Sequence, residues 1–461
     1  MDRHRIKDYV SETLKKQARG VDYIDIRVGG SRRTALSIRK RQIEEVSKPR
    51  SFGGSVRVLH RGGWGFVAFS EIEALPEAVG KAINWAKRVG REKSQLAPVE
   101  PQRDAVKLAE KDKGFEEVNL AKKIEIVRAY DTLAWDTGKK LVNVVSTYSD
   151  AVKWTLFAST EGALVEQEKA YVSAGVGVTA KEADVIQRYH LSLCDNNWGE
   201  IFGKEKEVRE TVLIAEEMAA SEVVKAGSYT VIIDQKMAGV FVHEAFGHLS
   251  EGDNTYENPQ LVRVMKLGRR FGSDKVTIVD DPTRIGWRGS YKYDDEGVPA
   301  SRAVLLDKGV LVGRMHSRET AGKMGEVPNG HARAAGVGQV PLVRMGITCI
   351  EPGKATFEEM LSSVNRGLYC INWQAGQTDH ERFTFTAGYA REINRGKLGR
   401  MVRDVKLTGN LFKTLANVEM VGNDAKYMGG TCGKGGQYVP ETSVAPHVLI
   451  KDLQVIGGEN D

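Results

Sequence analysis

One short segment of the chain holds the side chains best suited to chemistry. In His243-Glu244-Ala245-Phe246-Gly247-His248, a carboxylate directly follows one imidazole, and a second imidazole comes five positions after the first. Imidazoles bind zinc, and a carboxylate beside the metal can accept a proton from a water that the metal activates. These are the groups needed to hydrolyse an amide bond. The segment therefore predicts a zinc site that uses His243 and His248, with Glu244 as the general base.

The spacing of the two histidines is one residue longer than in the usual helical zinc motif, His-Glu-x-x-His. On a regular α-helix, positions five apart lie about 140° apart around the axis and could not share one metal. A single π-type turn would bring them back to one side, and Gly247 would make that deviation cheap. We therefore expect a helix over Gln235–Leu249, capped by Asp234 and distorted near 245–248. The alternative is a pair of ordinary core or surface histidines without a metal.

Catalytic zinc usually takes three protein ligands, so one more is needed. The candidates by residue type are Glu251, Asp253, His316, His331, His380 and Cys432. Cys432 is favoured because five of the ten residues 428–437 are glycines, which would let a loop press the sulfur against a metal. Lys434 nearby would favour the thiolate. The alternative for Cys432 is a small buried hydrophobic residue.

The elements that position these residues can be predicted from hydrophobic periodicity. Helices are expected over 3–19, 70–89, about 120–133 and about 203–221, hairpin strands over 142–193, and a strand over Tyr229–Ile233. An antiparallel meander is expected near the N-terminus, with strands at Tyr23–Val28, Ala35–Lys40, Gly54–His60 and Trp64–Phe69 and turns at Gly29-Gly30, Gly53-Gly54 and Gly62-Gly63.

The expected class is α+β, and a length of 461 residues predicts two or three domains. We place an N-terminal α/β domain with the antiparallel meander at 1–100. A middle α+β domain of helices and β-hairpins follows at 101–225. A mostly β C-terminal domain, which carries the zinc-site helix, covers 226–461.

Composition excludes several classes of protein. With 41% hydrophobic and 28% charged residues, the chain is typical of a soluble globular protein. No run of about 18 apolar residues exists, and the charged start lacks the apolar stretch of a secretion signal, so no membrane partner is expected. Four scattered cysteines without a Cys-x-x-Cys pair favour the cytoplasm. The net charge of +6 comes from interleaved acids and bases, which argues against a nucleic-acid partner.

Further blocks of sequence, in a fixed order, carry a resemblance to a known family. They are Glu44-Glu45-Val46, the segment from His243 to Asp253, Val279-Asp280-Asp281-Pro282-Thr283, Arg288-Gly289-Ser290, 294–299, 328–333, Gly376-Gln377-Thr378-Asp379, Leu407-Thr408-Gly409-Asn410 and Cys432-Gly433-Lys434. With these blocks the chain resembles the TldD/PmbA, or gyrase-modulator, family. It is most similar to the TldD-type subunit of that family.

The resemblance implies a metalloprotease that acts on peptides and unfolded protein segments. It implies one zinc ion held by His243, His248 and Cys432, with Glu244 as the general base. It also implies a homodimer, or a heterodimer with a metal-free paralogue, that encloses a cleft where peptides bind by strand addition. Further candidates for contacts with the substrate are Arg288, Asn329, His331 and Arg333. The sequence at 331–333 departs from the consecutive arginines of many bacterial members, which leaves the substrate preference open.

Two other classes of function fit parts of the sequence. A non-catalytic scaffold or partner subunit would hold zinc with four protein ligands and leave no open coordination position. A regulator of DNA-associated enzymes is suggested by the family's older name and by the slight positive charge. That function would require DNA affinity that falls with salt.

Overall fold

The computed structural model describes residues 2–17, 19–90, 94–107, 118–379 and 381–458. Helices and mainly antiparallel strands are mixed along the chain, and the strands form three large sheets and one two-stranded sheet. The expected α+β class is therefore confirmed. No helix among the described residues is long and apolar enough to cross a membrane.

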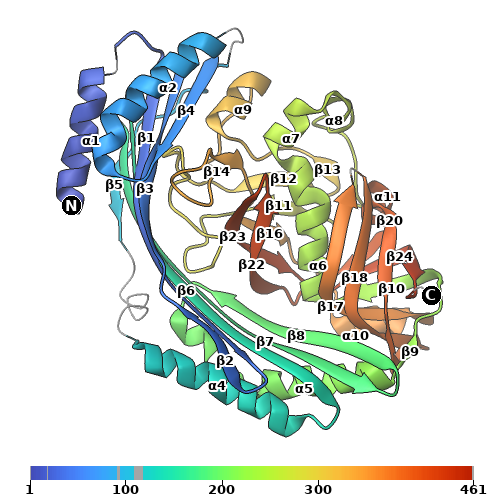
Figure 1. Ribbon diagram of the computed structural model, residues 1–461. Helices are drawn as coiled ribbons and strands as arrows, with labels where there is room; N and C mark the ends of the chain where they lie inside the picture. The colour runs from blue at the N-terminus through green and yellow to red at the C-terminus, as the bar shows by residue number, and fades with distance from the viewer. Residues whose placement is uncertain (1, 18, 91–93, 108–117, 380, 459–461) are drawn as a thin grey trace.

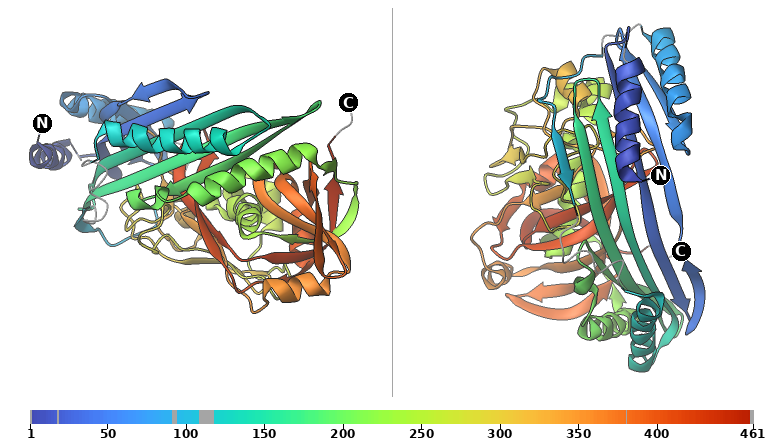
Figure 2. Two further views of the ribbon diagram at one scale, coloured as in Figure 1. Left: turned by 90° about the horizontal axis from the view of Figure 1, so that it is seen from below. Right: turned by 90° about the vertical axis from the view of Figure 1, so that its left-hand side faces the viewer.

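The first sheet is a long, curved layer that runs along one side of the molecule (Figures 1 and 2). Its strand order is β4-β3-β1-β6-β7-β5, with β2 beside β1 and β8 beside β7. Its strands are β1 (Tyr23–Arg39), β2 (Gln42–Ser47), β3 (Arg50–His60), β4 (Gly63–Phe69), β5 (Arg103–Val106), β6 (Leu141–Ser159), β7 (Leu164–Glu182) and β8 (Val185–Asp195).

Four helices cover the two ends of the first sheet. Helices α1 (Arg3–Gln17) and α2 (Leu75–Val89) share one apolar core with β1, β3 and β6. Helices α4 (Leu120–Thr137) and α5 (Glu205–Ala220) share another with β6, β7 and β8. Helices were predicted over all four of these segments. The sheet takes strands from both sides of residue 100, so the expected domain boundary there remains a proposal.

The N-terminal meander differs from the prediction at two of its three expected turns. Gly29-Gly30 lies inside the single strand β1, and Gly53-Gly54 lies inside β3, whereas a turn does occur at Arg61-Gly62. The interior glycines are needed for close packing. A Cβ at Gly29 would lie 2.9 Å from Val337, and one at Gly54 would clash with the ring of Phe69.

The second sheet closes on itself. The path β17-β10-β24-β20-β18 returns to β17 because β17 also pairs with β18. Strands β19, β9 and β21 attach at its margins. The strands are β9 (Glu222–Val223), β10 (Gly227–Ile233), β17 (Arg366–Asp379), β18 (Arg382–Asn394), β19 (Lys397–Arg403), β20 (Lys406–Asn410), β21 (Val418–Val421) and β24 (Val448–Ile456).

The third sheet has the order β13-β12-β11-β16-β23-β22, so β22 ends it. Its strands are β11 (Ile278–Asp280), β12 (Ala303–Asp307), β13 (Val310–Leu311), β16 (Ile347–Ile350), β22 (Lys426–Lys434) and β23 (Gln437–Ala445); β14 (Ala332–Arg333) pairs with β15 (Leu342–Val343). The short helices of this part are α7 (Gly252–Glu257), α8 (Pro259–Val264), α9 (Arg318–Met324), α10 (Phe357–Ser363) and α11 (Leu411–Ala416).

Helix α6 (Gln235–Val242) lies between the second and third sheets, as Figure 1 shows. Its side chains Met237, Phe241 and Val242 belong to the largest apolar core, which joins both sheets. Phe241 packs edge-on against the rings of Phe383 and Phe385 of β18. This packing fixes the helix, and with it the residues that follow its C-terminus.

Candidate metal centre

The histidine segment continues α6 through a π-type turn. The side chain of Asp234 accepts a hydrogen bond from the amide of Met237 and caps α6, as predicted. Residues His243–Gly247 form the π-type turn, and His248–Ser250 form one 3-10 turn. The ring centroids of His243 and His248 lie 5.3 Å apart. The predicted distortion is confirmed, and it brings the two imidazoles to the same side of the segment.

Gly247 is required for a reason that the sequence did not reveal. Its backbone angles, φ −56° and ψ −56°, are those of an ordinary helical residue. A Cβ at this position would clash with the sulfur of Met345. The glycine therefore makes room for Met345, and the π-type turn does not depend on glycine's conformational freedom.

Cys432 meets the two histidines in space although 184 residues separate it from His248. Its Sγ lies 3.5 Å from Nε2 of His248. One donor atom from each of His243, His248 and Cys432 lies within 4.8 Å of the other two. Cys432 is only 3% exposed, and it sits in strand β22 rather than in the loop we expected. Of the five candidates for the third ligand that lie among the described residues, it is the one that the structure brings to both histidines.

Two carboxylates lie on the outer sides of the imidazoles, one within hydrogen-bond distance of His248 and the other within ion-pair distance of His243. Oε2 of Glu251 lies 3.0 Å from Nδ1 of His248, and Oε2 of Glu441 lies 3.4 Å from Nδ1 of His243. Carboxylates in this position fix the orientation and tautomer of metal-binding histidines. Glu441 was missed by sequence reasoning because it lies in β23, far along the chain, without a motif of its own.

Lys434 joins the strand that carries Cys432 to the segment that carries the histidines. Its Nζ donates to Oε2 of Glu251 at 3.0 Å, to Oδ1 of Asp253 at 2.7 Å and to the carbonyl of Val343 at 3.1 Å. Glu251 is fully buried. Glu251 and Asp253, both candidates for the third ligand, are thus bound by Lys434 in this structure.

The charges of the site favour a thiolate beside protonated imidazoles. Burial opposes ionisation of Cys432, but hydrogen bonds from the two imidazoles and their charge lower its pKa to about 6. Burial likewise opposes protonation of His248, but Glu251 and Cys432 raise its pKa to about 9. A metal ion must displace these protons, so metal affinity would rise with pH.

Glu244 follows His243 directly and is half-buried. Its carboxylate makes no hydrogen bond or ion pair with any residue in the described part of the chain. Glu251 and Glu441, by contrast, are held by neighbouring side chains. A carboxylate without such partners keeps both oxygens available to accept a proton.

Two other histidines that were candidates for the third ligand lie in the framework. His316 bonds to Thr320 and Glu326, and His331 is fully buried between Asn329 and Asp280. His380 lies outside the described residues. These contacts separate His316 and His331 from the three donors.

The four candidates for substrate contact are mostly buried as well. Arg288 donates to the carbonyls of Gly430 and Val172, and Asn329 donates to that of Arg314. Arg333 donates to two backbone carbonyls and also lines a cavity. Their contact with a substrate therefore stays a prediction, and Arg333 is the candidate nearest to open space.

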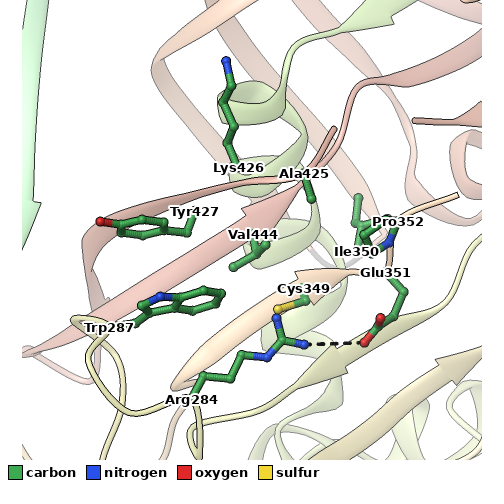
Figure 3. A pocket seen from close by; sticks show the side chains of 10 residues that line it. All are labelled: Arg284, Trp287, Cys349, Ile350, Glu351, Pro352, Ala425, Lys426, Tyr427 and Val444. Atoms are coloured by element: carbon green, nitrogen blue, oxygen red, sulfur yellow. Dashed lines mark ion pairs between the residues drawn. The ribbon is translucent and has the colours of Figure 1, made fainter. Parts of the chain in front are cut away.

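A separate cavity of about 680 Å³ lies at the far end of the β22–β23 hairpin (Figure 3). The rings of Trp287 and Tyr427 stack there with centroids 5.3 Å apart, and Arg284 pairs with Glu351 at 3.7 Å. Tyr427 is five residues before Cys432, so its side chain points to the opposite face of β22. This cavity takes no part in the metal centre.

Comparison with known proteins places the chain among relatives of one kind. Residues 24–88, 113–225 and 226–457 match domain 1, the central domain and the C-terminal domain of the PmbA/TldA metallopeptidases. A metalloprotease of Synechocystis sp. is 39% identical, covering 98% of this chain and 98% of that protein. A zinc metalloprotease TldD homolog of Saccharolobus solfataricus is 26% identical, covering 88% and 90%.

The same fold occurs in a solved structure. The crystal structure of TldE from Thermococcus kodakarensis aligns with a TM-score of 0.79 at 18% identity, covering 97% of this chain and 100% of that one. The likeness extends over the first sheet as well as the part that holds the histidines. Because all three domains match in order and relatives align over nearly the whole length, the chain belongs to the PmbA/TldD family of metallopeptidases.

Proposed function

We propose that the protein is a zinc-dependent peptidase that hydrolyses peptide bonds in peptides or unfolded protein segments. One observation supports this above all: two imidazoles and a thiol meet with donor atoms within 4.8 Å of one another. Glu244 directly follows the first of these histidines in the chain. The zinc metalloprotease name of the Saccharolobus relative agrees with this choice of metal.

The three donors fit zinc. Two nitrogen ligands and one thiolate are a usual zinc set, and three protein ligands leave a position open, as a catalytic site requires. His243, His248 and Cys432 would hold the ion, while Glu251 and Glu441 would keep the imidazoles in place. Bound zinc would supply a Lewis acid that polarises a carbonyl and makes a water more acidic.

Glu244 would act as the general base. Placed one residue after His243, it would accept a proton from the attacking water and pass that proton to the departing amine. Its lack of partners among the described residues leaves it able to do both. General acid–base catalysis of this kind contributes about 10²- to 10⁴-fold to the rate.

The substrate would bind as an extended chain. Strand β22 carries Cys432, ends the third sheet and pairs with β23 alone among the described strands. Its other edge could therefore receive a peptide through main-chain hydrogen bonds, which depend little on the side chains of the substrate. We also propose that the protein forms a dimer, with a second copy or with a metal-free paralogue, that admits unfolded chains.

The test combines metal analysis with an assay of hydrolysis. Purified protein should hold about one zinc ion per chain and should cleave casein, an unstructured substrate, until a chelator removes the metal. Glu244→Gln should keep the zinc and lose at least about 10²-fold in rate, since it removes only the base. Glu257→Gln, at the exposed end of α7, is the matched control and should change neither. Undiminished cleavage by Glu244→Gln, or four protein ligands around the zinc, would contradict the proposal.

A further inference from the structure

A second cavity, of about 480 Å³, lies between the first sheet and the C-terminal part of the chain. Strands β1, β3, β6 and β7 form one wall, and segment 333–338 with the start of β23 forms the other. Pro440 of β23 lines this cavity, whereas the neighbouring Glu441 points toward His243. His243, His248 and Cys432 are not among the residues that line this cavity, so it is distinct from the metal centre.

The cavity is lined by an excess of cations. Lys153, Lys169, Arg33 and Arg333 line it, with Asp295 as the one carboxylate among its lining residues in the described part of the chain. Asp295 is already engaged, because its Oδ2 accepts the amide hydrogen of Ala334.

Among the described residues, none of these lysine and arginine side chains makes an ion pair with a carboxylate. Nζ of Lys153 donates to the carbonyl of Ala335 at 3.1 Å, and Arg333 donates to the carbonyls of Met345 and Pro440. Within the described residues, Lys169 has no hydrogen bond and no ion pair, and its Nζ lies 5.1 Å from the centroid of the Tyr291 ring. Both lysines are partly buried, and a partly buried cation that lacks an ion pair favours the binding of an anion from solution.

The pKa of Lys169 agrees with this uncompensated charge. Burial is the main cause that lowers it to about 8. The charge of Asp295 opposes this shift, and the positive charges of Arg333 and Lys153 add to it. Burial also lowers the pKa of Lys153. Both groups would return toward their usual values if an anion occupied the cavity.

Apart from the charged residues, the lining combines aromatic rings and apolar residues with the polar side chains Ser31, Ser51, Ser70, Thr155 and Gln167. Phe52, Phe69, Trp154 and Tyr171 contribute rings, and Gly29 lets segment 333–338 approach the sheet. A cavity of this size and lining suits a small organic molecule that is mostly apolar and carries a charged group. Inorganic anions would leave the aromatic walls without a partner.

We propose that this cavity binds a small organic carboxylate, with the carboxylate at Lys169 and Lys153 and an aromatic or apolar group against the rings of the wall. Two sources share this chemistry: the free carboxyl end of a peptide fragment, and a simple aromatic acid. The site is separate from the metal centre and does not depend on the proposed peptidase activity.

Calorimetric titration tests the proposal with three probes. N-acetylphenylalanine represents the carboxyl end of a peptide, and 3-phenylpropionate represents a simple aromatic acid. N-acetylphenylalaninamide has the structure of the first probe but carries an uncharged amide in place of the carboxylate. At least one acid should bind, and the amide should bind at least about tenfold more weakly because it lacks the charge-assisted hydrogen bonds. Binding of the first acid alone identifies a peptide end, and binding of both identifies a general carboxylate site. Equal affinity for acid and amide, or no binding of either acid, would overturn the proposal.

Variants locate the site. Lys169→Met should lower the affinity for the acids at least about tenfold. Lys181→Met replaces an exposed lysine on the same strand and should leave that affinity unchanged. Glu244→Gln and chelated protein should bind the acids as the wild type does, so failure of the peptidase proposal would leave this result intact. Chemical acetylation of lysine side chains in the wild-type protein at pH 8 tests the site without any substitution. Lys169 should be labelled in free protein and protected by the acid, and labelling that the acid leaves unchanged would contradict the assignment.

Discussion

Lys434 offers a sharp test of how the metal centre is built, because it links the two elements that carry the proposed ligands. The replacement Lys434→Met keeps the length of the side chain and removes its charge. It deprives Glu251 of a partner at 3.0 Å and Asp253 of one at 2.7 Å. Glu251 is fully buried, whereas the Lys434 side chain is 17% exposed.

The magnitude follows from that burial. Removal of one member of a buried ion pair costs about 3–5 kcal/mol because the remaining charge stays buried without a partner. His248 still holds Glu251, and Lys434 is partly exposed, so we expect a loss of about 2–4 kcal/mol in the free energy of unfolding. Zinc affinity should fall about 10- to 100-fold because Glu251 would no longer be fixed beside His248.

The assay is a double-mutant cycle with Glu251→Gln, measured by urea unfolding of chelated protein and by competition for zinc with a coloured chelator. The sum of the two single-variant losses in the free energy of unfolding should exceed the loss in the double variant by about 1–3 kcal/mol, because each single substitution removes the same contact. Lys426→Met, at the exposed start of β22, is the control and should cost less than about 0.5 kcal/mol. Additive losses, or zinc affinity equal to that of the control, would refute the proposed coupling between Lys434 and His248.

Three further predictions concern single positions. Gly247→Ala should cost about 1–3 kcal/mol in urea unfolding, because its Cβ would press on the Met345 sulfur. Glu441→Gln should weaken zinc binding about 10-fold in the chelator competition, because the amide holds the His243 imidazole less firmly. Lys169→Met should stabilise the protein by about 1–2 kcal/mol at pH 7, a figure reduced for the partial exposure of Lys169. Lysine in the unfolded chain, with its pKa of about 10.4, binds a proton more readily than Lys169 in the folded protein. The stability of the wild type should therefore rise between pH 8 and about 10.4. Above that range the difference in stability between the wild type and Lys169→Met should vanish.

The helix that carries the histidines could be predicted because its signals are local. Asp234 is a good N-cap, the apolar residues after it recur with helical period, and the five-residue spacing of His243 and His248 requires a wider turn if both are to face one metal. All of this information lies within about four turns of one helix. No contact with a distant part of the chain was needed.

Predictions failed where the reason for a residue lies far away in sequence. Glycine pairs in the first sheet were taken for turns, since glycine is common in turns. Gly29 and Gly54 are instead strand residues whose Cβ would meet Val337 and Phe69. Glu441 could not be found for the same reason, because only the fold brings it to His243.

The glycines around Cys432 have a comparable explanation, and it changes how the thiol is positioned. They were expected to form a pliable loop, but Gly429 and Gly430 lie in β22, in register with Thr442 and Glu441 of β23. A Cβ at Gly430 would clash with the Glu441 carboxylate, and one at Gly429 would clash with the carbonyl of Cys194. The strand can therefore lie against both neighbours only without side chains there.

That arrangement makes the two elements of the metal centre support each other. The β22–β23 hairpin supplies Cys432 and also Glu441, which reaches across to His243. The helical segment supplies both histidines and also Glu251, which reaches across to Lys434 on the hairpin. Each element thus carries at least one proposed ligand and one carboxylate that contacts the other element. A shift of the hairpin against the helix would break both contacts at once, so the packing of the two elements, more than either one alone, fixes the distance between the sulfur and the imidazoles.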